Sequence, residues 1–190
     1  MINFITGGAR SGKSALAETL ATKSGLEVVY VATARAGDDE MIERIRQHRQ
    51  RRPDHWTTVE EPLELAEVLR LQAAAGRFVI VDCLTLWLGN LLFADFPAGH
   101  GSDEEVRVIE PGALFTAQRA AFLRALAGLP GELAVISNEL GMGVIPLGAL
   151  SRLFVDEAGR LNQEVAARAN RVILMVSGCP LVVKGEALPC

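Results

Sequence analysis

Short apolar runs alternate with longer, helix-favouring stretches along this chain. The runs are apolar throughout, which is typical of strands in a parallel sheet that is covered on both faces. We expect strands at residues 2–6, 28–33, 56–60, 77–82, 132–137 and 171–177, and a small edge strand at 182–184. We expect helices at residues 15–22, 38–51, 63–74, 84–93, 114–126 and 150–169, the last interrupted at Gly159. The alternation predicts an α/β fold, a mostly parallel β-sheet flanked by helices on both faces.

The length and composition indicate one globular unit. A chain of 190 residues favours a single domain, which we place at residues 1–190. Hydrophobic residues make up 49% and charged residues 22%, as in globular proteins. The formal net charge of −4 does not indicate general affinity for nucleic acid, so no nucleic-acid partner is expected.

The cysteines and the apolar runs bear on the compartment. Cys83, Cys179 and Cys190 are too few and too scattered for a disulfide framework or a zinc cluster, so a reducing cytoplasm is the simplest setting. The apolar stretch at the N-terminus is too short for a signal peptide. No run of eighteen apolar residues occurs, so we expect no membrane span.

A glycine-rich turn lies between the first expected strand and the first expected helix. It fits the pattern G-x-x-x-x-G-K-[ST], in which backbone N–H groups and a helix N-terminus cradle phosphates. Its residues are Gly7, Gly8, Ala9, Arg10, Ser11, Gly12, Lys13 and Ser14. Lys13 would reach the β- and γ-phosphates, and the Ser14 hydroxyl would bind Mg²⁺. The alternative is an ordinary glycine turn, but the flanking strand and helix agree with a nucleotide-binding loop.

A second nucleotide-binding feature is the apolar strand at residues 79–81, which ends in Asp82. A carboxylate at a strand tip beside a phosphate loop can hold Mg²⁺, whereas the alternative is a simple strand-end cap. The loop at residues 34–37 follows the carboxyl end of another expected strand, where ligands of open α/β sheets bind.

His48 lies on an expected helix that is rich in arginine. One interpretation is that it packs beside Met41 and Ile45 on one face of this helix. The other is that nearby cations keep its imidazole neutral and nucleophilic, while the arginines bind phosphate. The arginines of this segment are Arg44, Arg46, Arg49, Arg51 and Arg52. This set suits attack by His48 on a nucleotide phosphorus, with a phosphoramidate intermediate.

Two further groups of polar residues follow expected strands. Glu60 and Glu61 could meet a nucleotide base or ribose, although from the residues alone a loop carboxylate is favoured. Asn138 and Glu139 could contact an acceptor, or could form a helix cap or turn.

These residues together resemble the bifunctional adenosylcobinamide kinase/adenosylcobinamide-phosphate guanylyltransferase family of cobalamin biosynthesis. The resemblance covers nearly the whole chain and depends most on the segment His48-Arg49 to Arg52-Pro53 and on Asn138-Glu139-Leu140-Gly141-Met142-Gly143. It also includes the phosphate loop and Ala32-Thr33, Asp38 to Met41, Arg44-Ile45, Trp56, Thr58, Glu60, Asn90 to Leu92, Asp156, Gly159, Asn162 and Val176 to Gly178.

The resemblance implies two reactions at one site. The first is phosphorylation of adenosylcobinamide by ATP or GTP. The second transfers GMP from GTP to adenosylcobinamide phosphate, and a histidine matching His48 carries the GMP covalently. It also implies a RecA-like P-loop NTPase fold and a homotrimer. Residue 47 is glutamine here, whereas some members of the family have a second histidine beside the nucleophile.

The family's nucleotide contacts carry over to particular positions of this chain. The phosphate loop corresponds to the triphosphate site, and Mg²⁺ would be held by Ser14 and Asp82. The remaining matched positions are Ala34, Arg35, Ala36, Arg49, Arg51, Arg52, Glu60 and Asp82.

Two other functions fit the phosphate loop. A simple small-molecule kinase would transfer only the γ-phosphate and would use His48 structurally. A non-enzymatic nucleotide-gated module would bind nucleotide and use the arginine helix as an interaction surface. His48 within its arginine cluster favours the bifunctional enzyme, because neither alternative needs it.

Overall fold

The fold is seen in a computed structural model that describes residues 1–35, 37, 39, 42–43, 46, 49–50, 52–95 and 109–188. Three of the residues expected to bind nucleotide or to catalyse, Ala36, His48 and Arg51, lie outside the described residues. So do Met41, Arg44 and Ile45 of the expected arginine helix.

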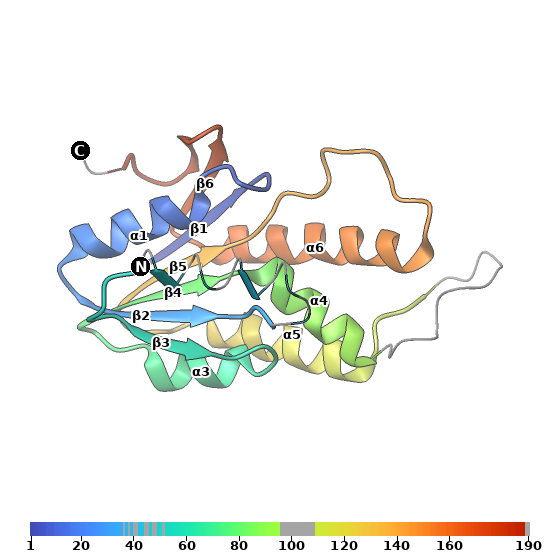
Figure 1. The fold of residues 1–190 in the computed structure, drawn as a ribbon, viewed down its shortest axis with the longest axis horizontal. Coiled ribbons are helices and arrows are strands. Elements are labelled where there is room, and N and C mark those ends of the chain that lie inside the picture. Colours follow the sequence, from blue (N-terminus) through green and yellow to red (C-terminus); the bar gives the residue numbers. More distant parts are fainter. Residues whose placement is uncertain are drawn as a thin grey trace.

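A seven-stranded sheet forms the centre of the molecule (Figure 1). Its order is β3-β2-β4-β5-β1-β6-β7, and all neighbouring pairs are parallel except β6 and β7. The strands are β1 Ile2–Gly7, β2 Glu27–Ala32, β3 Thr57–Glu60, β4 Arg77–Asp82, β5 Glu132–Ile136, β6 Arg171–Val176 and β7 Cys179–Lys184. The expected strands are therefore confirmed, including the edge strand β7 at the C-terminal end.

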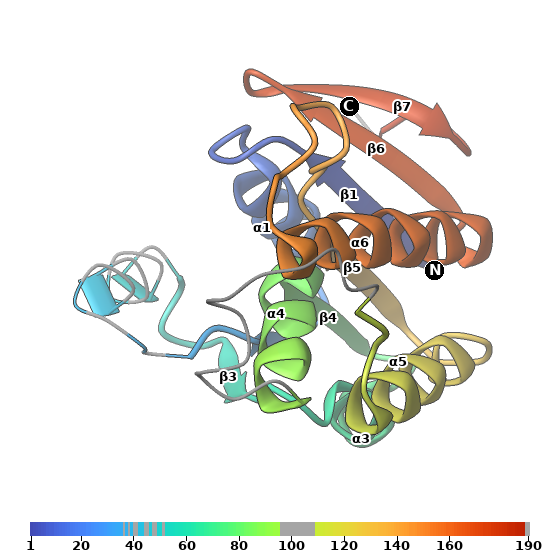
Figure 2. The ribbon, with the colours of Figure 1, turned by 90° about the vertical axis from the view of Figure 1, so that its right-hand side faces the viewer.

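Helices cover the sheet unequally (Figure 2). Helix α1 (Lys13–Ser24) lies on one face, where its residues Ala17 and Ala21 are buried against the sheet. The other face carries α3 (Leu65–Gln72), α4 (Leu84–Asp95), α5 (Ala113–Ala125) and α6 (Ala149–Arg168). Successive β2 residues alternate between the two cores: Val28 and Tyr30 face α1, and Val29 and Val31 face the other layer. Both faces are apolar, as the continuous hydrophobic runs predicted.

The predicted interruption at Gly159 is wrong, because α6 is continuous from Ala149 to Arg168. Glycine inside a helix costs about 1 kcal/mol relative to alanine. Leu161 and Val165, two and six residues later, are completely or almost completely buried, and burying each such side chain contributes about 1.5–3 kcal/mol. Burial of one helix face therefore outweighs the local preference of a single residue.

Segments that lie far apart in sequence meet at the carboxyl edge of the sheet. Figure 2 looks toward this edge, where the phosphate loop after β1 and the loop after β5 lie beside each other. The segment after β2 and the strand end at Asp82 open onto the same edge. Among the helices that the structure describes, none combines the length and apolar character required to cross a membrane.

Candidate functional site

Backbone geometry shapes the phosphate loop. Gly7 has φ 147°, and a Cβ atom there would lie 2.4 Å from the carbonyl oxygen of Met175 on the neighbouring strand β6. Gly12 precedes α1 in the left-handed region with φ 100°, which favours glycine. These two positions allow the chain to leave β1 and enter α1 within five intervening residues, as the glycine pattern predicted.

Neighbouring segments hold the loop from outside. The backbone N–H of Gly178, in the turn between β6 and β7, donates to the carbonyl oxygen of Ser11 at 2.9 Å. The backbone N–H of Glu139, after β5, donates to the carbonyl oxygen of Gly7 at 3.0 Å. The Glu139 carboxylate accepts a hydrogen bond from the N–H of Gly141 at 3.2 Å. This contact is of the kind expected if Glu139 forms a turn, one of the two interpretations of this residue. Two regions of the family resemblance thus support the phosphate loop directly.

Lys13 occupies the centre of the loop. Its side-chain ammonium donates to the carbonyl oxygens of Gly7 at 3.0 Å and Gly8 at 2.6 Å. The side chain is buried, and this desolvation lowers the pKa of Lys13 below its ordinary value, although the charges of Cys83 and Asp82 oppose the shift. A cation surrounded by loop carbonyls and backbone N–H groups is placed to meet anionic phosphate oxygens.

Ser14 and Asp82 come together as expected. The Ser14 hydroxyl donates to Asp82 Oδ2 at 2.8 Å, across 68 residues of sequence. A hydroxyl and a carboxylate are hard oxygen ligands, and Mg²⁺ in nucleotide sites commonly uses one or two such protein ligands and completes its shell with water and phosphate. The donor set therefore fits Mg²⁺ at this position.

Tyr30 is a further contact of Asp82. The buried phenol donates to the same Oδ2 atom that Ser14 contacts. Burial raises the pKa of Tyr30 well above its ordinary value, and the adjacent Asp82 charge raises it further. Tyr30 therefore stays protonated and acts as a hydrogen-bond donor to the carboxylate.

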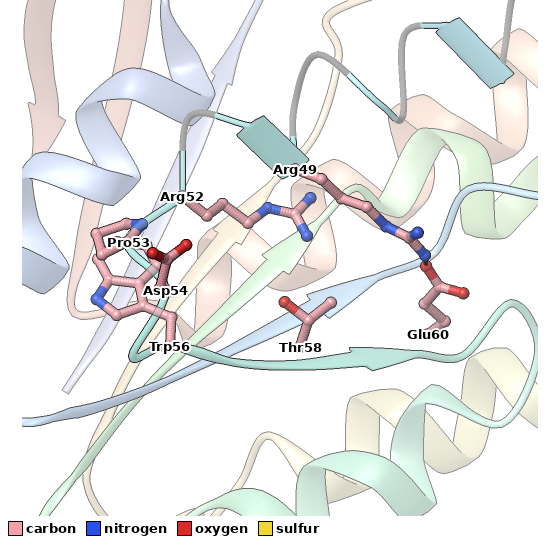
Figure 3. Close-up of a pocket in the computed structure, with 7 residues that line it drawn as sticks. All are labelled: Arg49, Arg52, Pro53, Asp54, Trp56, Thr58 and Glu60. Carbon is pink, nitrogen blue, oxygen red and sulfur yellow. Dashed lines mark hydrogen bonds and ion pairs between the residues drawn. The ribbon is translucent and has the colours of Figure 1, made fainter.

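A pocket of about 580 Å³ opens beside β3 (Figure 3). It is lined by Arg49, Arg52, Pro53, Asp54, Trp56, Thr58 and Glu60. The Cζ atom of Arg52 lies 3.5 Å from the centre of the Tyr30 ring, in a cation–π contact. The chain of contacts Arg52–Tyr30–Asp82–Ser14 therefore connects this pocket to the phosphate loop.

The described arginines differ in their partners. Arg46 forms two hydrogen bonds with the Glu43 carboxylate, at 2.7 and 2.6 Å. Arg49 pairs with Glu60, so two residues that were both matched to nucleotide contacts meet across the pocket (Figure 3). Arg52 contacts the Tyr30 ring instead. The basic cluster expected from sequence is thus partly neutralised by carboxylates.

The remaining expected nucleotide contacts follow β2. Ala34 is half-buried and Arg35 is exposed in the loop after this strand. The loop begins at Thr33, whose N–H donates to the carbonyl oxygen of Asp82 at 3.0 Å. The Asn90 side chain donates to the carbonyl oxygen of Thr33 at 2.7 Å. The residues after β2 are therefore tied to the strand end that carries Asp82.

Sequence reasoning missed Tyr30, because it assigned residues 28–33 only to a buried strand. The available signal was composition: Tyr30 is the single tyrosine of the chain and stands in an aliphatic run. A buried tyrosine hydroxyl usually finds a hydrogen-bond partner, so its presence there indicates a polar contact at the end of the sheet.

Solved structures resemble this fold. The ATPase EscN of the type III secretion system from enteropathogenic E. coli has a TM-score of 0.53 and 14% identity, over 93% of this chain and 43% of that chain. A prototypical type III secretion ATPase has a TM-score of 0.51 and 14% identity, over 91% of this chain and 50% of that chain. At this identity the likeness concerns the fold alone, and it agrees with the expected RecA-like P-loop NTPase.

Three curated relatives match over essentially their whole length. The bifunctional adenosylcobalamin biosynthesis protein CobP of Pseudomonas aeruginosa is 53% identical over 99% of this chain and 100% of that protein. Proteins called bifunctional adenosylcobalamin biosynthesis protein CobU are 40% identical in Escherichia coli and 36% in Salmonella typhimurium, each over 97% of this chain and 100% of the relative.

The family match gives the resemblance a firm basis. Residues 3–183 match the CobU family, described as cobinamide kinase / cobinamide phosphate guanyltransferase. The match includes the phosphate loop, Asp82 and the Arg49–Glu60 pair. With this extent and with full-length relatives at 36–53% identity, the chain belongs to the CobU family of kinases and nucleotidyltransferases.

Proposed function

We propose that this protein phosphorylates adenosylcobinamide with ATP or GTP and then converts the phosphate to adenosylcobinamide-GDP with GTP. In the first step, the acceptor hydroxyl oxygen attacks the γ-phosphorus, its proton leaves, and a nucleoside diphosphate departs. In the second step, GMP passes from GTP to the acceptor phosphate and pyrophosphate is released. Both steps use the same phosphate loop.

Lys13 and the loop N–H groups would bind the β- and γ-phosphates in the first step. Charge that develops on the transferred group is stabilised by donors that are already oriented, which is the main catalytic contribution in phosphoryl transfer. Ser14 and Asp82 would hold Mg²⁺, which when bound neutralises negative charge on the phosphates.

His48 would act as the nucleophile of the second step. A neutral ring nitrogen attacks the α-phosphorus of GTP, the bond to the bridging oxygen breaks, and pyrophosphate leaves. An oxygen of adenosylcobinamide phosphate then attacks the same phosphorus, and the N–P bond breaks to restore the histidine. This route replaces one difficult displacement by two easier ones.

The pocket of Figure 3 would bind the rest of the GTP. Arg52 lies near Asp82 through Tyr30, so it would contact the phosphates, as would Arg51. Glu60, Arg49 and the loop residues Ala34, Arg35 and Ala36 would contact the guanosine. A carboxylate such as Glu60 can accept hydrogen bonds from a guanine edge, a donor arrangement that adenine does not offer.

The observation that carries the proposal is the chain of contacts Arg52–Tyr30–Asp82–Ser14. It brings Arg52, four positions after His48 in sequence, beside the proposed magnesium ligands of the phosphate loop. The arginine segment and the loop can therefore act on one nucleotide, which a covalent GMP mechanism requires.

A labelling experiment tests the nucleophile. After incubation with α-³²P-GTP and Mg²⁺, we expect label on the protein in a bond that is stable to base and cleaved by acid, as for a phosphoramidate. His48→Ala should abolish the label. His55→Ala is the matched control, because His55 is an exposed histidine near the same segment. Undiminished labelling of His48→Ala would exclude this residue as the nucleophile and favour a different covalent site. A wild-type protein that phosphorylates cobinamide but is not labelled would instead favour a simple kinase.

The proposal also includes the domain organisation, the cellular compartment and the oligomeric state. We take residues 1–190 as one P-loop nucleotide-binding domain, supported by the continuous sheet that joins β3 to β7. A cytoplasmic setting is supported by the free thiols of Cys83 and Cys179. A homotrimer is supported by Val144 and Leu147, each 97% exposed, since assembly would cover apolar side chains. Light scattering coupled to gel filtration would measure the mass of the assembly.

A further inference from the structure

Tyr30 occupies a central position between the two ends of the nucleotide site. It lies in the middle of β2, where its backbone pairs with Thr58 of β3 and Ile80 of β4. Its side chain is 1% exposed and packs in the core on the α1 face. The other buried aromatic residues of that core are Phe78 and Trp56.

The hydroxyl of Tyr30 orients the Asp82 carboxylate. Asp82 stands on β4 two residues beyond Ile80, the backbone partner of Tyr30, so the side chains of Tyr30 and Asp82 lie on the same face of the sheet on adjacent strands. Tyr30 and Ser14 both donate to Oδ2, and two donors on one oxygen fix the orientation of the carboxylate plane. A hydrogen bond to a carboxylate is stronger than one between neutral groups, so its loss has a measurable effect.

The ring of Tyr30 orients Arg52. The guanidinium carbon lies 3.5 Å from the ring centre, and Nε and Nη1 are buried without a hydrogen-bond partner among the residues that the structure describes. Arg46 and Arg49 are instead held by carboxylates, which neutralise their charge. An aromatic face attracts a guanidinium without supplying a counter-charge, so Arg52 keeps its capacity to bind an anion.

We propose that Tyr30 is a positioning residue that links the two ends of the site, its hydroxyl holding Asp82 for the magnesium end and its ring holding Arg52 for the α-phosphate end. This inference rests on the proposed function. It assigns two effects to one side chain, which are separated by comparing a substitution that removes the hydroxyl alone with one that removes the hydroxyl and the ring.

Tyr30→Phe removes the hydroxyl and keeps the ring. The variant should bind a non-hydrolysable GTP analogue normally in EDTA, while the enhancement of binding by Mg²⁺ falls about tenfold, because the carboxylate has lost a charge-assisted hydrogen bond. At saturating Mg²⁺, the rate of covalent labelling by α-³²P-GTP should stay within about twofold of wild type, since the ring still supports Arg52. An unchanged Mg²⁺ enhancement would overturn the role of the hydroxyl.

Tyr30→Met removes the ring together with its hydroxyl and leaves a flexible, somewhat smaller apolar side chain, so its difference from Tyr30→Phe isolates the ring. Labelling should slow by about tenfold or more at saturating Mg²⁺, and Arg52→Gln should slow it similarly. The double variant should be no slower than Arg52→Gln alone, because both changes remove the same contact. Effects that simply multiply in the double variant would overturn the role of the ring.

Phe78→Met is the matched control for loosening of the same core, because Phe78 is equally buried in that cluster. It should retain both the Mg²⁺ enhancement and the labelling rate. If Phe78→Met reproduces the losses, Tyr30 is merely structural and the inference fails. If the wild-type protein is not labelled at all, the proposed guanylyl transfer fails instead, and the analogue-binding measurement still tests the hydroxyl independently.

Discussion

The phosphate loop and the arginine segment are built by different means. The loop is held by backbone groups: Gly178 donates to Ser11, Glu139 donates to Gly7, and Lys13 donates to loop carbonyls. The segment around Arg49 and Arg52 is held by side chains, through an ion pair with Glu60 and a cation–π contact with Tyr30. One end of the site is therefore defined by main-chain geometry around the buried Lys13, and the other is half-exposed and defined by residue identity.

This difference explains how a common fold serves an uncommon pair of reactions. Backbone hydrogen bonds are insensitive to most side-chain changes, so the loop geometry can recur among distant P-loop proteins. Side-chain contacts can be changed one residue at a time, so under the proposed function the arginine end is the part that can be adapted to a particular nucleotide. The loop end should therefore respond to substitution mainly through catalysis and stability, and the arginine end mainly through nucleotide recognition.

The largest effect should come from the buried cation of the loop. Lys13→Ala should reduce both phosphoryl and guanylyl transfer by about 100- to 1000-fold, because an oriented donor to developing phosphate charge is lost. Single-turnover rates with ATP and GTP would measure this. Lys23→Ala, at the exposed end of the same helix, is the control and should keep both rates. Retained guanylyl transfer in Lys13→Ala would mean that the two reactions do not share the loop.

The next effect concerns the backbone of the loop. Gly7→Ala should lower the free energy of unfolding by about 3 kcal/mol, because its Cβ atom would collide with the carbonyl of Met175 at an unfavourable φ. Urea denaturation would measure the change. Gly8→Ala should cost less than about 1 kcal/mol, since a Cβ atom there meets nothing within 4 Å. Equal costs at both positions would contradict a loop defined by tight main-chain packing.

Burial at the loop end also predicts a dependence of stability on pH. Burial, together with the adjacent Asp82 charge, raises the pKa of the Cys83 thiol from 9.0 to about 12. The folded protein keeps this proton while the unfolded chain releases it, so the stabilisation is complete below pH 9 and decreases as the pH rises toward 12. About 2 kcal/mol should be lost by about pH 10.5.

Comparison of two cysteine variants isolates this contribution. In Cys83→Ala, the decrease in the free energy of unfolding that ionisation of this thiol causes above pH 9 should be absent. Urea unfolding at pH values above and below 9 would measure it. Cys179→Ala should retain this decrease, because Cys179 is exposed. If the wild type and Cys83→Ala lose stability in parallel, the thiol ionises equally in both states and the strand end is more hydrated than the structure indicates.

The smallest effect on stability should come from the arginine end. Arg49→Ala should change the free energy of unfolding by less than about 1 kcal/mol, because both members of the Arg49–Glu60 pair are more than half exposed. GTP affinity should nevertheless fall by about tenfold, as for loss of a charged contact. Arg70→Ala breaks the similarly exposed pair with Glu67 and should leave GTP affinity unchanged. Calorimetry of GTP binding distinguishes recognition from a general effect of surface charge.

Local sequence was enough to predict the strand–loop–helix unit and most other elements. Each strand is a continuous apolar run, and the phosphate loop depends on glycines at fixed spacing whose backbone requirements follow from their chemistry. The position of Asp82 beside the loop was predictable because it ends such a run at the carboxyl edge of the sheet, and its role as a metal ligand stays a prediction. The error at Gly159 arose because a local preference was weighed without the burial of the surrounding helix.

Tertiary structure alone decided which side chains complete the site. The phosphate-loop motif led us to expect Ser14 and Asp82 at one site, but Tyr30 meets Asp82 across 52 residues and this contact does not follow from local spacing. The strand order places β2 beside β4, which brings Tyr30 to Asp82, and the tertiary fold also places Arg52 over the Tyr30 ring. The sequence by itself determined that a nucleotide-binding loop exists and which residue types surround it. Packing of the sheet determined their partners, because such contacts depend on the order of strands that are distant in sequence.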